Sequence, residues 1–128
     1  MSQLTEAQMK YLHVIYKAEN ADGGIRSVEI ARDLGVSKAA VSRMMKLLAG
    51  MGLIFIKENG QIELTEKGKS AGSSIHRRVI EIHPFFADYL ELNEPEATDS
   101  TYFFLSGFSK RCVDTLLGKG WTVKQSGI

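Results

Sequence analysis

The stretch that decides the fold is Ser27–Arg43, which reads SVEIARDLGVSKAAVSR. Two short helices that cross closely need a small residue at the crossing, and Ala31 supplies it. The turn between them needs a residue that tolerates a left-handed backbone, and Gly35 follows four positions later. The apolar side chains that would lock the two helices together are Leu34, Val36 and Val41. Because one spacing meets all these demands, the stretch predicts a helix-turn-helix.

Capping residues set the expected bounds of these two helices. Ser27 is expected to cap a short helix over Val28–Leu34, and Ser37 to cap the next helix, from Lys38 to Gly50 or Met51. Gly52 then stops that helix. The residues expected to pack the shorter helix inward are Val28, Ala31 and Leu34. Those expected to pack the longer helix inward are Val41, Met44, Met45 and Leu48.

The flanks of this motif predict a preceding helix and a following hairpin. Thr5–Gln8 has the spacing of a capping box, which indicates a first helix over about Glu6–Glu19. After the motif, the β-prone run Leu53–Ile56 and the alternating run Gln61–Leu64 are separated by an Asn59-Gly60 turn signal. We therefore expect a two-stranded wing.

Further helices are expected after the wing. Thr65 is placed to cap a helix through about Ile82, and Pro84 is expected to interrupt or restart it, because proline has no N–H to donate. Two shorter helices are expected over 99–107 and 109–117. The whole chain is thus predicted to be mostly α: a winged helix-turn-helix of three helices and a two-stranded wing, then a helical region.

Composition limits the class of protein. The 128 residues are 44% hydrophobic and 24% charged, which suits a single compact domain. There is no stretch of roughly 20 apolar residues and no signal-peptide pattern. The single cysteine, Cys112, excludes an internal disulfide framework and suits a reducing cytoplasm. Residues 1–83 carry twelve Lys/Arg against nine Asp/Glu, whereas 84–100 carry five acids and no base. A polyanion is therefore expected to meet the N-terminal part.

The outward face of the helix over 38–51 carries the expected chemistry. Its side chains are Ser37, Lys38, Ala39, Ser42, Arg43 and Lys46. Small residues at its start let a helix approach the floor of a DNA major groove, and Arg43 suits either a guanine or a phosphate. In the wing, Lys57 is expected at a backbone phosphate with Asn59 beside it. The alternative is that these are merely solvated polar side chains, which does not account for motif and wing together.

Aromatic residues are concentrated late in the chain. The whole sequence has eleven, and seven of them fall within residues 85–108. Apart from Tyr102, they are Phe85, Phe86, Tyr89, Phe103, Phe104 and Phe108. That is more than a short pair of helices buries alone, so we expect these residues to form a homodimer interface. The expected organisation is a DNA-binding domain at 1–66, a helical dimerisation region at 67–118 and a tail at 119–128.

The sequence resembles the diphtheria toxin repressor and manganese transport regulator family over residues 4–90. The residues that carry the resemblance are Leu4-Thr5-Glu6, Tyr11-Leu12, Ile15-Tyr16, the helix-turn-helix, Leu47, Gly52-Leu53-Ile54 and Leu64–Gly68. The resemblance implies an N-terminal domain that reads DNA and later helices that dimerise, with iron or manganese between them as the switch. Related winged helices, such as the multiple-antibiotic-resistance regulators, share the DNA-reading motif.

The resemblance also implies where metal ligands would lie. The matching positions here are Lys10, His13, His83, Tyr102, Leu105 and Ser106. Only the two histidines are of a metal-binding type, so the manganese or iron switch is expected to be lost and no cofactor is expected. One alternative is that His13, His76 and His83 hold zinc, nickel or copper. The favoured interpretation is that they are ordinary half-buried histidines.

The sequence therefore predicts a cytoplasmic regulator, a repressor, that binds double-stranded DNA as a homodimer on an inverted repeat. No phosphate loop, dinucleotide fingerprint or nucleophile elbow is present, so no enzyme is expected. The alternatives are a metal-responsive repressor with an altered histidine site and a winged helix used for protein–protein assembly. An enzyme using Cys112 and a histidine is a remote third, because we expect that thiol to be buried on an apolar helix face.

Overall fold

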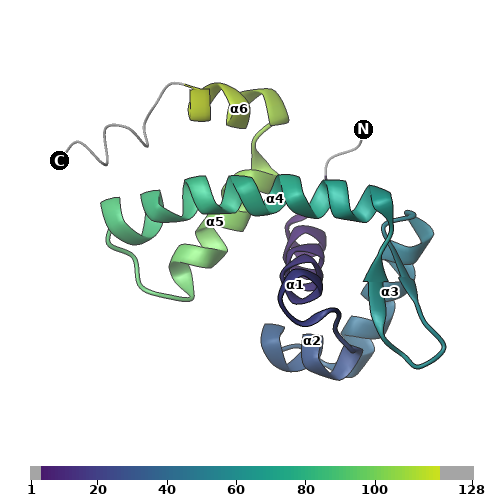
Figure 1. Ribbon diagram of the computed structural model, residues 1–128. Helices are drawn as coiled ribbons and strands as arrows, with labels where there is room; N and C mark the ends of the chain where they lie inside the picture. The colour runs from purple at the N-terminus through teal and green to yellow at the C-terminus, as the bar shows by residue number, and fades with distance from the viewer. Residues whose placement is uncertain (1–3, 119–128) are drawn as a thin grey trace. The chain divides into compact units, whose positions relative to one another are not determined.

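The computed structural model describes residues 4–118, apart from the side chain of Asp22 (Figure 1). The chain divides into two units: an N-terminal unit, Ala7–Ile75, and a C-terminal unit made of 4–6 and 76–118 among the described residues. The division falls inside helix α4 (Glu66–Pro84). The predicted tail at 119–128 lies outside the described residues. Within the described range, no helix combines the length and the apolar character needed to cross a membrane.

The N-terminal unit has the predicted order of elements. They are α1 (Glu6–Asp22), α2 (Ser27–Leu34), α3 (Lys38–Gly50), β1 (Ile54–Ile56), β2 (Ile62–Leu64) and the first part of α4. The two strands pair antiparallel, with Ile54 opposite Leu64 and Ile56 opposite Ile62, and the hairpin lies beside α3 (Figure 1). The predicted fold class, a mostly α winged helix-turn-helix followed by further helices, is confirmed.

A shared core fixes which face of α3 points outward. Val41, Met45 and Leu48 recur at helical spacing and are at most 2% exposed. Each such burial stabilises the fold by about 1.5–3 kcal/mol. The other side chains of this core that are likewise almost fully buried are Leu12, Ile15, Ile30 and Ile62.

The turn of the motif has the predicted geometry. Gly35 has φ 65° and ψ 37°, the left-handed region that glycine adopts without strain, and its N–H donates to the carbonyls of Ala31 and Arg32. Ser37 caps α3 as predicted, because its Oγ accepts the Ala40 N–H at 3.0 Å.

Two predictions about α2 are wrong. Ser27 is the first helical residue, and Arg26 holds the N-cap position, where its backbone N–H donates to Glu29 Oε1 at 2.9 Å. Val28 is 53% exposed, because the buried face of this helix is centred on Ile30 and Ala31 instead. A helix of only two turns gives the sequence too few apolar positions to define that face.

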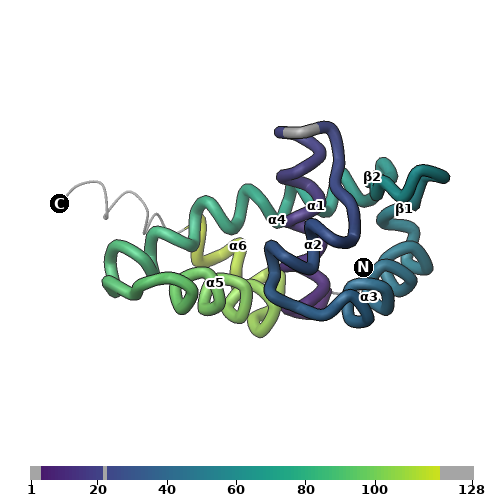
Figure 2. The backbone as a smooth tube through the Cα atoms, turned by 90° about the horizontal axis from the view of Figure 1, so that it is seen from below, coloured from purple at the N-terminus to yellow at the C-terminus, as the bar shows by residue number. Residues whose placement is uncertain are grey.

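The C-terminal unit continues α4 and adds three elements. They are the π-helical turn η1 (Phe85–Tyr89), α5 (Glu96–Gly107) and α6 (Lys110–Gly118). α4 ends at Pro84, where an interruption or restart was predicted: the φ of Pro84, −60°, is helical, and the chain continues directly into the π-helical turn, where the Leu90 N–H donates to Phe85 O. Figure 2 shows α5 running back along the C-terminal half of α4.

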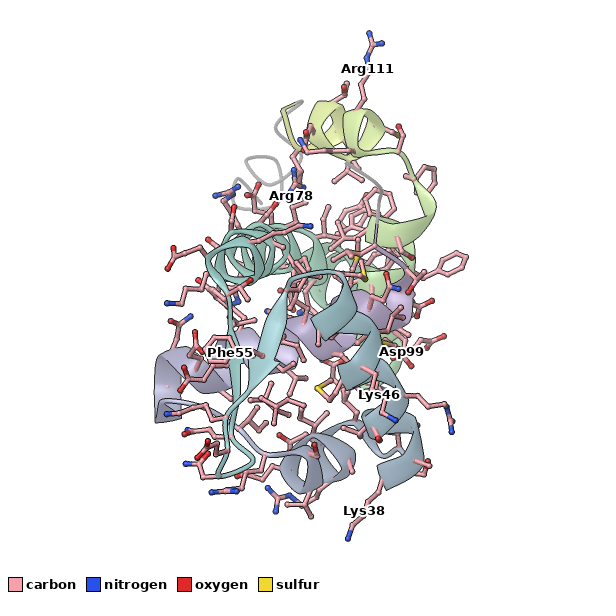
Figure 3. The ribbon with its side chains drawn as sticks, turned by 90° about the vertical axis from the view of Figure 1, so that its right-hand side faces the viewer. Lys38, Lys46, Phe55, Arg78, Asp99 and Arg111 are labelled. Carbon is pink, nitrogen blue, oxygen red and sulfur yellow. The ribbon has the colours of Figure 1, made fainter. Side chains whose placement is uncertain are left out.

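An ion pair joins α6 to α4, because Arg78 Nη2 lies 2.9 Å from Asp114 Oδ1. Within α6, Lys110 Nζ lies 2.9 Å from Asp114 Oδ2. Figure 3 shows Arg78 reaching from α4 toward α6, whereas Arg111 points away from the protein. Cys112 is exposed on α6, so the expectation of a buried thiol is wrong. The helix buries Val113 instead, one position along.

Candidate nucleic-acid interface

The outward face of α3 is as open as its periodicity predicts. Lys38 and Lys46 extend from this helix in Figure 3. All six side chains expected on this face are exposed: Ser37, Lys38, Ala39, Ser42, Arg43 and Lys46. They lie opposite the buried Val41, Met45 and Leu48, so the core holds the face in place. The result is a rigid, protruding helix whose first turn carries only small side chains and one lysine.

Charge on this helix is uncompensated. Its sequence contains three cationic residues and no acidic one. Across the described residues, Lys38, Arg43 and Lys46 have no carboxylate within ion-pair distance, whereas Lys57, Arg78 and Lys110 each have one. Unpaired surface cations keep their charge available for phosphate oxygens, which is the largest contribution to non-specific DNA affinity.

The wing, defined as β1, β2 and the turn Lys57–Gln61, projects beside this helix. Its turn is closed by the Lys57 N–H donating to Gln61 O and the Gly60 N–H donating to Lys57 O, both at 2.8 Å. The two predicted DNA-contacting side chains of the wing already have partners. Lys57 Nζ lies 3.1 Å from Glu63 Oε2, and Asn59 Oδ1 accepts the Gln61 N–H at 3.0 Å. A phosphate at Lys57 must therefore share the ammonium with Glu63.

One cation near the wing was not predicted. Arg26 donates from Nη1 to the backbone carbonyl of Asn59, at the tip of the wing. The two residues are 33 positions apart, and no local pattern in the sequence indicates the contact.

The positions where the resemblance implies metal ligands do not suit a manganese or ferrous ion. Lys10 lies half-buried and His13 buried on α1, while His83 Nε2 lies 2.8 Å from Glu94 Oε2. The hydrogen bond from the Thr98 side chain is the main cause that lowers the pKa of Glu94, and the hydrogen bond with His83 lowers it further. Burial raises the pKa of Tyr102 to about 12, so that phenol stays neutral and is a weak ligand. Leu105 is a buried hydrocarbon.

His83 has an acidic neighbour in Glu94, but the histidines do not gather further ligands into a metal centre within residues 4–118. His76 and His83 are both half-buried on α4. Among the described residues, no three His, Cys, Asp or Glu side chains gather as a group that would hold an ion. A single carboxylate beside one imidazole falls short of the set of hard oxygen ligands that manganese and iron prefer.

The C-terminal unit brings the late aromatic residues together. Ring centroids lie 5.2 Å apart for Phe85–Phe86, 6.5 Å for Phe86–Phe104 and 4.8 Å for Phe104–Phe108. Phe85 also stacks on Tyr89 at 5.5 Å. Tyr89, Phe103 and Phe108 are 59%, 66% and 48% exposed. The rings thus form an aromatic cluster on η1 and α5, with Phe103 projecting outward.

The fold and the α3 face together define a winged helix-turn-helix DNA-binding domain of the kind found in transcriptional regulators. Residues 3–61 match the family described as the iron dependent repressor, N-terminal DNA binding domain. An HTH-type transcriptional regulator of Methanocaldococcus jannaschii, itself uncharacterized, is 29% identical over 99 residues, which cover 77% of this chain and 78% of the relative. Both descriptions are of regulators and not of enzymes, in agreement with the prediction.

Solved structures extend the likeness beyond the matched domain. The manganese regulator SloR superposes with a TM-score of 0.73 and 26% identity, over 92% of this chain and 55% of SloR. The metal-dependent transcriptional regulator MtsR gives 0.73 and 25%, over 88% and 53%. The chain therefore spans about half the length of these two regulators. A hypothetical protein of Sulfolobus solfataricus, 22% identical with a TM-score of 0.63, shares the fold over 93% of this chain and 91% of its own.

Proposed function

We propose that the chain is a repressor that reads a specific double-stranded DNA sequence as a homodimer on an inverted repeat. The observation that carries the proposal is the α3 face, where three cations lack carboxylate partners among the described residues and the first turn has small side chains. A helix of this kind enters the major groove at its N-terminal end. Since the target is genomic DNA, the protein acts inside the cell.

Each exposed side chain of α3 has a role that its chemistry suits. Arg43 makes two N–H donations to a guanine, and Lys38 and Lys46 contact phosphates on either side of the groove. Ser42 donates to a phosphate or a base edge. Ser37 accepts the Ala40 N–H with its oxygen, so its hydroxyl hydrogen remains to donate to a phosphate. The wing rests on the adjacent backbone through Lys57.

Dimerisation is assigned to the helical region at 67–118. Tyr89, Phe103 and Phe108 expose apolar rings that a monomer leaves in water. In a two-fold dimer each copy contributes the same surface patch to the interface. A dimer formed at this aromatic cluster therefore buries the exposed rings of both copies. A two-fold dimer that reads an inverted repeat presents its recognition helices roughly 34 Å apart, which is one turn of DNA.

The proposed repressor does not require manganese or ferrous iron. SloR is named a manganese regulator, but this chain has an ammonium at Lys10, a neutral phenol at Tyr102 and a hydrocarbon at Leu105 where the resemblance implies ligands. An ammonium repels a dication, and none of the implied ligand positions holds a carboxylate that would offset the dehydration of the ion. DNA binding is therefore expected to persist in a chelator.

The test is a comparison of Arg43→Ala with wild type on a duplex selected from a random library and on a random duplex. We expect the variant to lose about 1–3 kcal/mol on the selected duplex and much less on the random one. Arg77→Ala is the matched control, because Arg77 is an equally exposed arginine on α4. If Arg43→Ala loses the same factor on both duplexes, Arg43 is a phosphate anchor. If selection enriches no sequence, specific reading is contradicted.

A further inference from the structure

The α1–α2 turn, Gly23–Arg26, is joined to the wing at three successive points, and we call these contacts the wing strap. They proceed from the turn-proximal end of β2 to the tip of the wing. The bonds run from the Ile62 N–H to Ile25 O (2.8 Å), from Gln61 Nε2 to Gly23 O (3.1 Å), and from Arg26 Nη1 to Asn59 O. The turn is therefore a fixed support along one edge of the hairpin.

The fit between turn and wing is close. Gly24 has φ 148°, and a Cβ added to it would overlap the amide nitrogen of Gln61. At the turn-proximal end of β2, Ile25 and Ile62 are 5% and 0% exposed, so the core holds the strands up to this point whatever the side chains of the turn do. The tip, Glu58–Asn59, is exposed. Its position depends on the contacts that reach beyond the core.

Arg26 is the member of the strap that reaches the tip. Its backbone is itself anchored, because it is the N-cap of α2 and its N–H donates to Glu29 Oε1 at 2.9 Å. Since α2 packs on α3 through the buried Ile30 and Ala31, Arg26 links the helix-turn-helix to the tip of the wing. Its guanidinium thereby fixes where the tip lies relative to the recognition helix.

We propose that Arg26 is a positioning residue, which holds the wing so that Lys57 and the α3 face meet one duplex at the same time. This inference rests on the DNA binding proposed above. Without the strap the wing tip takes more orientations, and ordering it on DNA costs conformational entropy that the Lys57–phosphate contact must offset. Arg26 acts through the wing and not through a phosphate contact of its own.

The experiment is a double-mutant cycle with Arg26→Met and Lys57→Ala, titrated with the selected duplex at several salt concentrations. We expect each single variant to weaken binding on the order of threefold and to lower the salt slope by about one. The double variant is expected to have the same affinity as each single variant, and a salt slope that is lower than that of wild type by about one. The reason is that the same contact between the wing and DNA is lost in all three variants. If Arg26 touches a phosphate itself, the losses multiply and the slope falls by about two, which overturns the proposal.

A neutral variant sharpens the test. Gln61→Met removes the middle hydrogen bond of the wing strap without changing the charge of the protein. If the Arg26→Met protein unfolds below the assay temperature, Gln61→Met is used in its place in the cycle. We expect it to lower the salt slope too, and to be non-additive with Lys57→Ala. An unchanged slope in Gln61→Met contradicts positioning by the strap.

The matched charge control is Arg32→Met. Arg32 is an exposed arginine on α2 that pairs with Asp33 at 3.7 Å and has no contact with the wing. Any loss it causes is expected to multiply with that of Lys57→Ala. If wild type binds the duplex but the losses of Arg26→Met and Lys57→Ala multiply, this inference alone is contradicted. If wild type binds no duplex, the proposed function is contradicted.

Discussion

At Gly68, the backbone of α4 passes against the end of the recognition helix and the base of the wing. The Gly68 N–H donates to Thr65 Oγ1 at 3.0 Å, and that hydroxyl donates in turn to Gly52 O at 2.6 Å. A Cβ at Gly68 would overlap the carbonyl oxygen of Leu53 and lie 2.9 Å from its carbon. The atom in the way belongs to the backbone and cannot rotate aside.

Gly68→Ala is therefore expected to lower the free energy of unfolding by about 1–3 kcal/mol through overpacking. Gly50→Ala is the matched control: Gly50 is also helical, and nothing lies within 4 Å of a Cβ there. That control is expected to be neutral or stabilising by up to about 1 kcal/mol. Urea denaturation of both variants measures the difference. A Gly68→Ala protein as stable as wild type would show that α4 does not approach Leu53 so closely.

At the scale of elements, the sequence predicts what is set locally. Ser37, Val41, Met45 and Leu48 lie within one helix, so capping and periodicity were enough to place α3 and its outward face. The hairpin followed from the Asn59-Gly60 turn between two β-prone runs. The exposed residues of the α3 face could therefore be predicted from the sequence. Their contacts with DNA remain a prediction.

Features that depend on distant contacts were not predicted. Val28 was assigned inward because its own short helix does not show which face the rest of the unit covers. Pro84 was expected to interrupt or restart the helix, but no local pattern indicates that a π-helical turn follows it directly. The Arg26–Asn59 and Lys57–Glu63 contacts join residues that only the folded chain brings together.

The attachment of α6 gives an element-scale prediction. Lys110, one helical turn away, and then Arg78 on α4 hold the pKa of Asp114 below its usual range. Because the folded pKa is the lower one, ionised Asp114 stabilises the folded state above the unfolded pKa, and this contribution is lost as the pH falls through the folded value. Lys110→Gln and Arg78→Gln are each expected to raise the pKa of Asp114 in an NMR titration. Arg111→Gln, at a side chain that points away, is the control, and an equal rise in it would contradict the assignment.

At the scale of the whole molecule, charge is unevenly distributed along the chain. The exposed acids of 84–100 all belong to the C-terminal unit: Asp88, Glu91, Glu94, Glu96 and Asp99. The unpaired cations of α3 belong to the N-terminal unit. A polyanion is therefore attracted to one unit and repelled by the other. We expect the exposed aromatic cluster of the C-terminal unit to contact a second copy of the chain instead of DNA.

Phe103→Ser is expected to convert the proposed dimer to a monomer without unfolding it. Phe103 is 66% exposed and outside the ring contacts of the aromatic cluster, so its loss leaves the core intact. Phe55→Ser is the control, since Phe55 is 46% exposed on β1, outside the assigned interface. Analytical ultracentrifugation at micromolar concentration measures both variants. A monomeric wild type at that concentration would remove the dimer, and the inverted repeat with it.

The most direct test of the account is a titration of wild type, in a chelator, with the selected and the random duplex at two salt concentrations. The account predicts that the selected duplex binds roughly a thousandfold more tightly. Affinity for both should fall steeply with salt, and restored manganese or ferrous iron should change it by less than about tenfold. Tighter binding by tenfold or more with either metal would contradict the loss of the metal switch. No binding to any duplex at low salt would contradict the central claim.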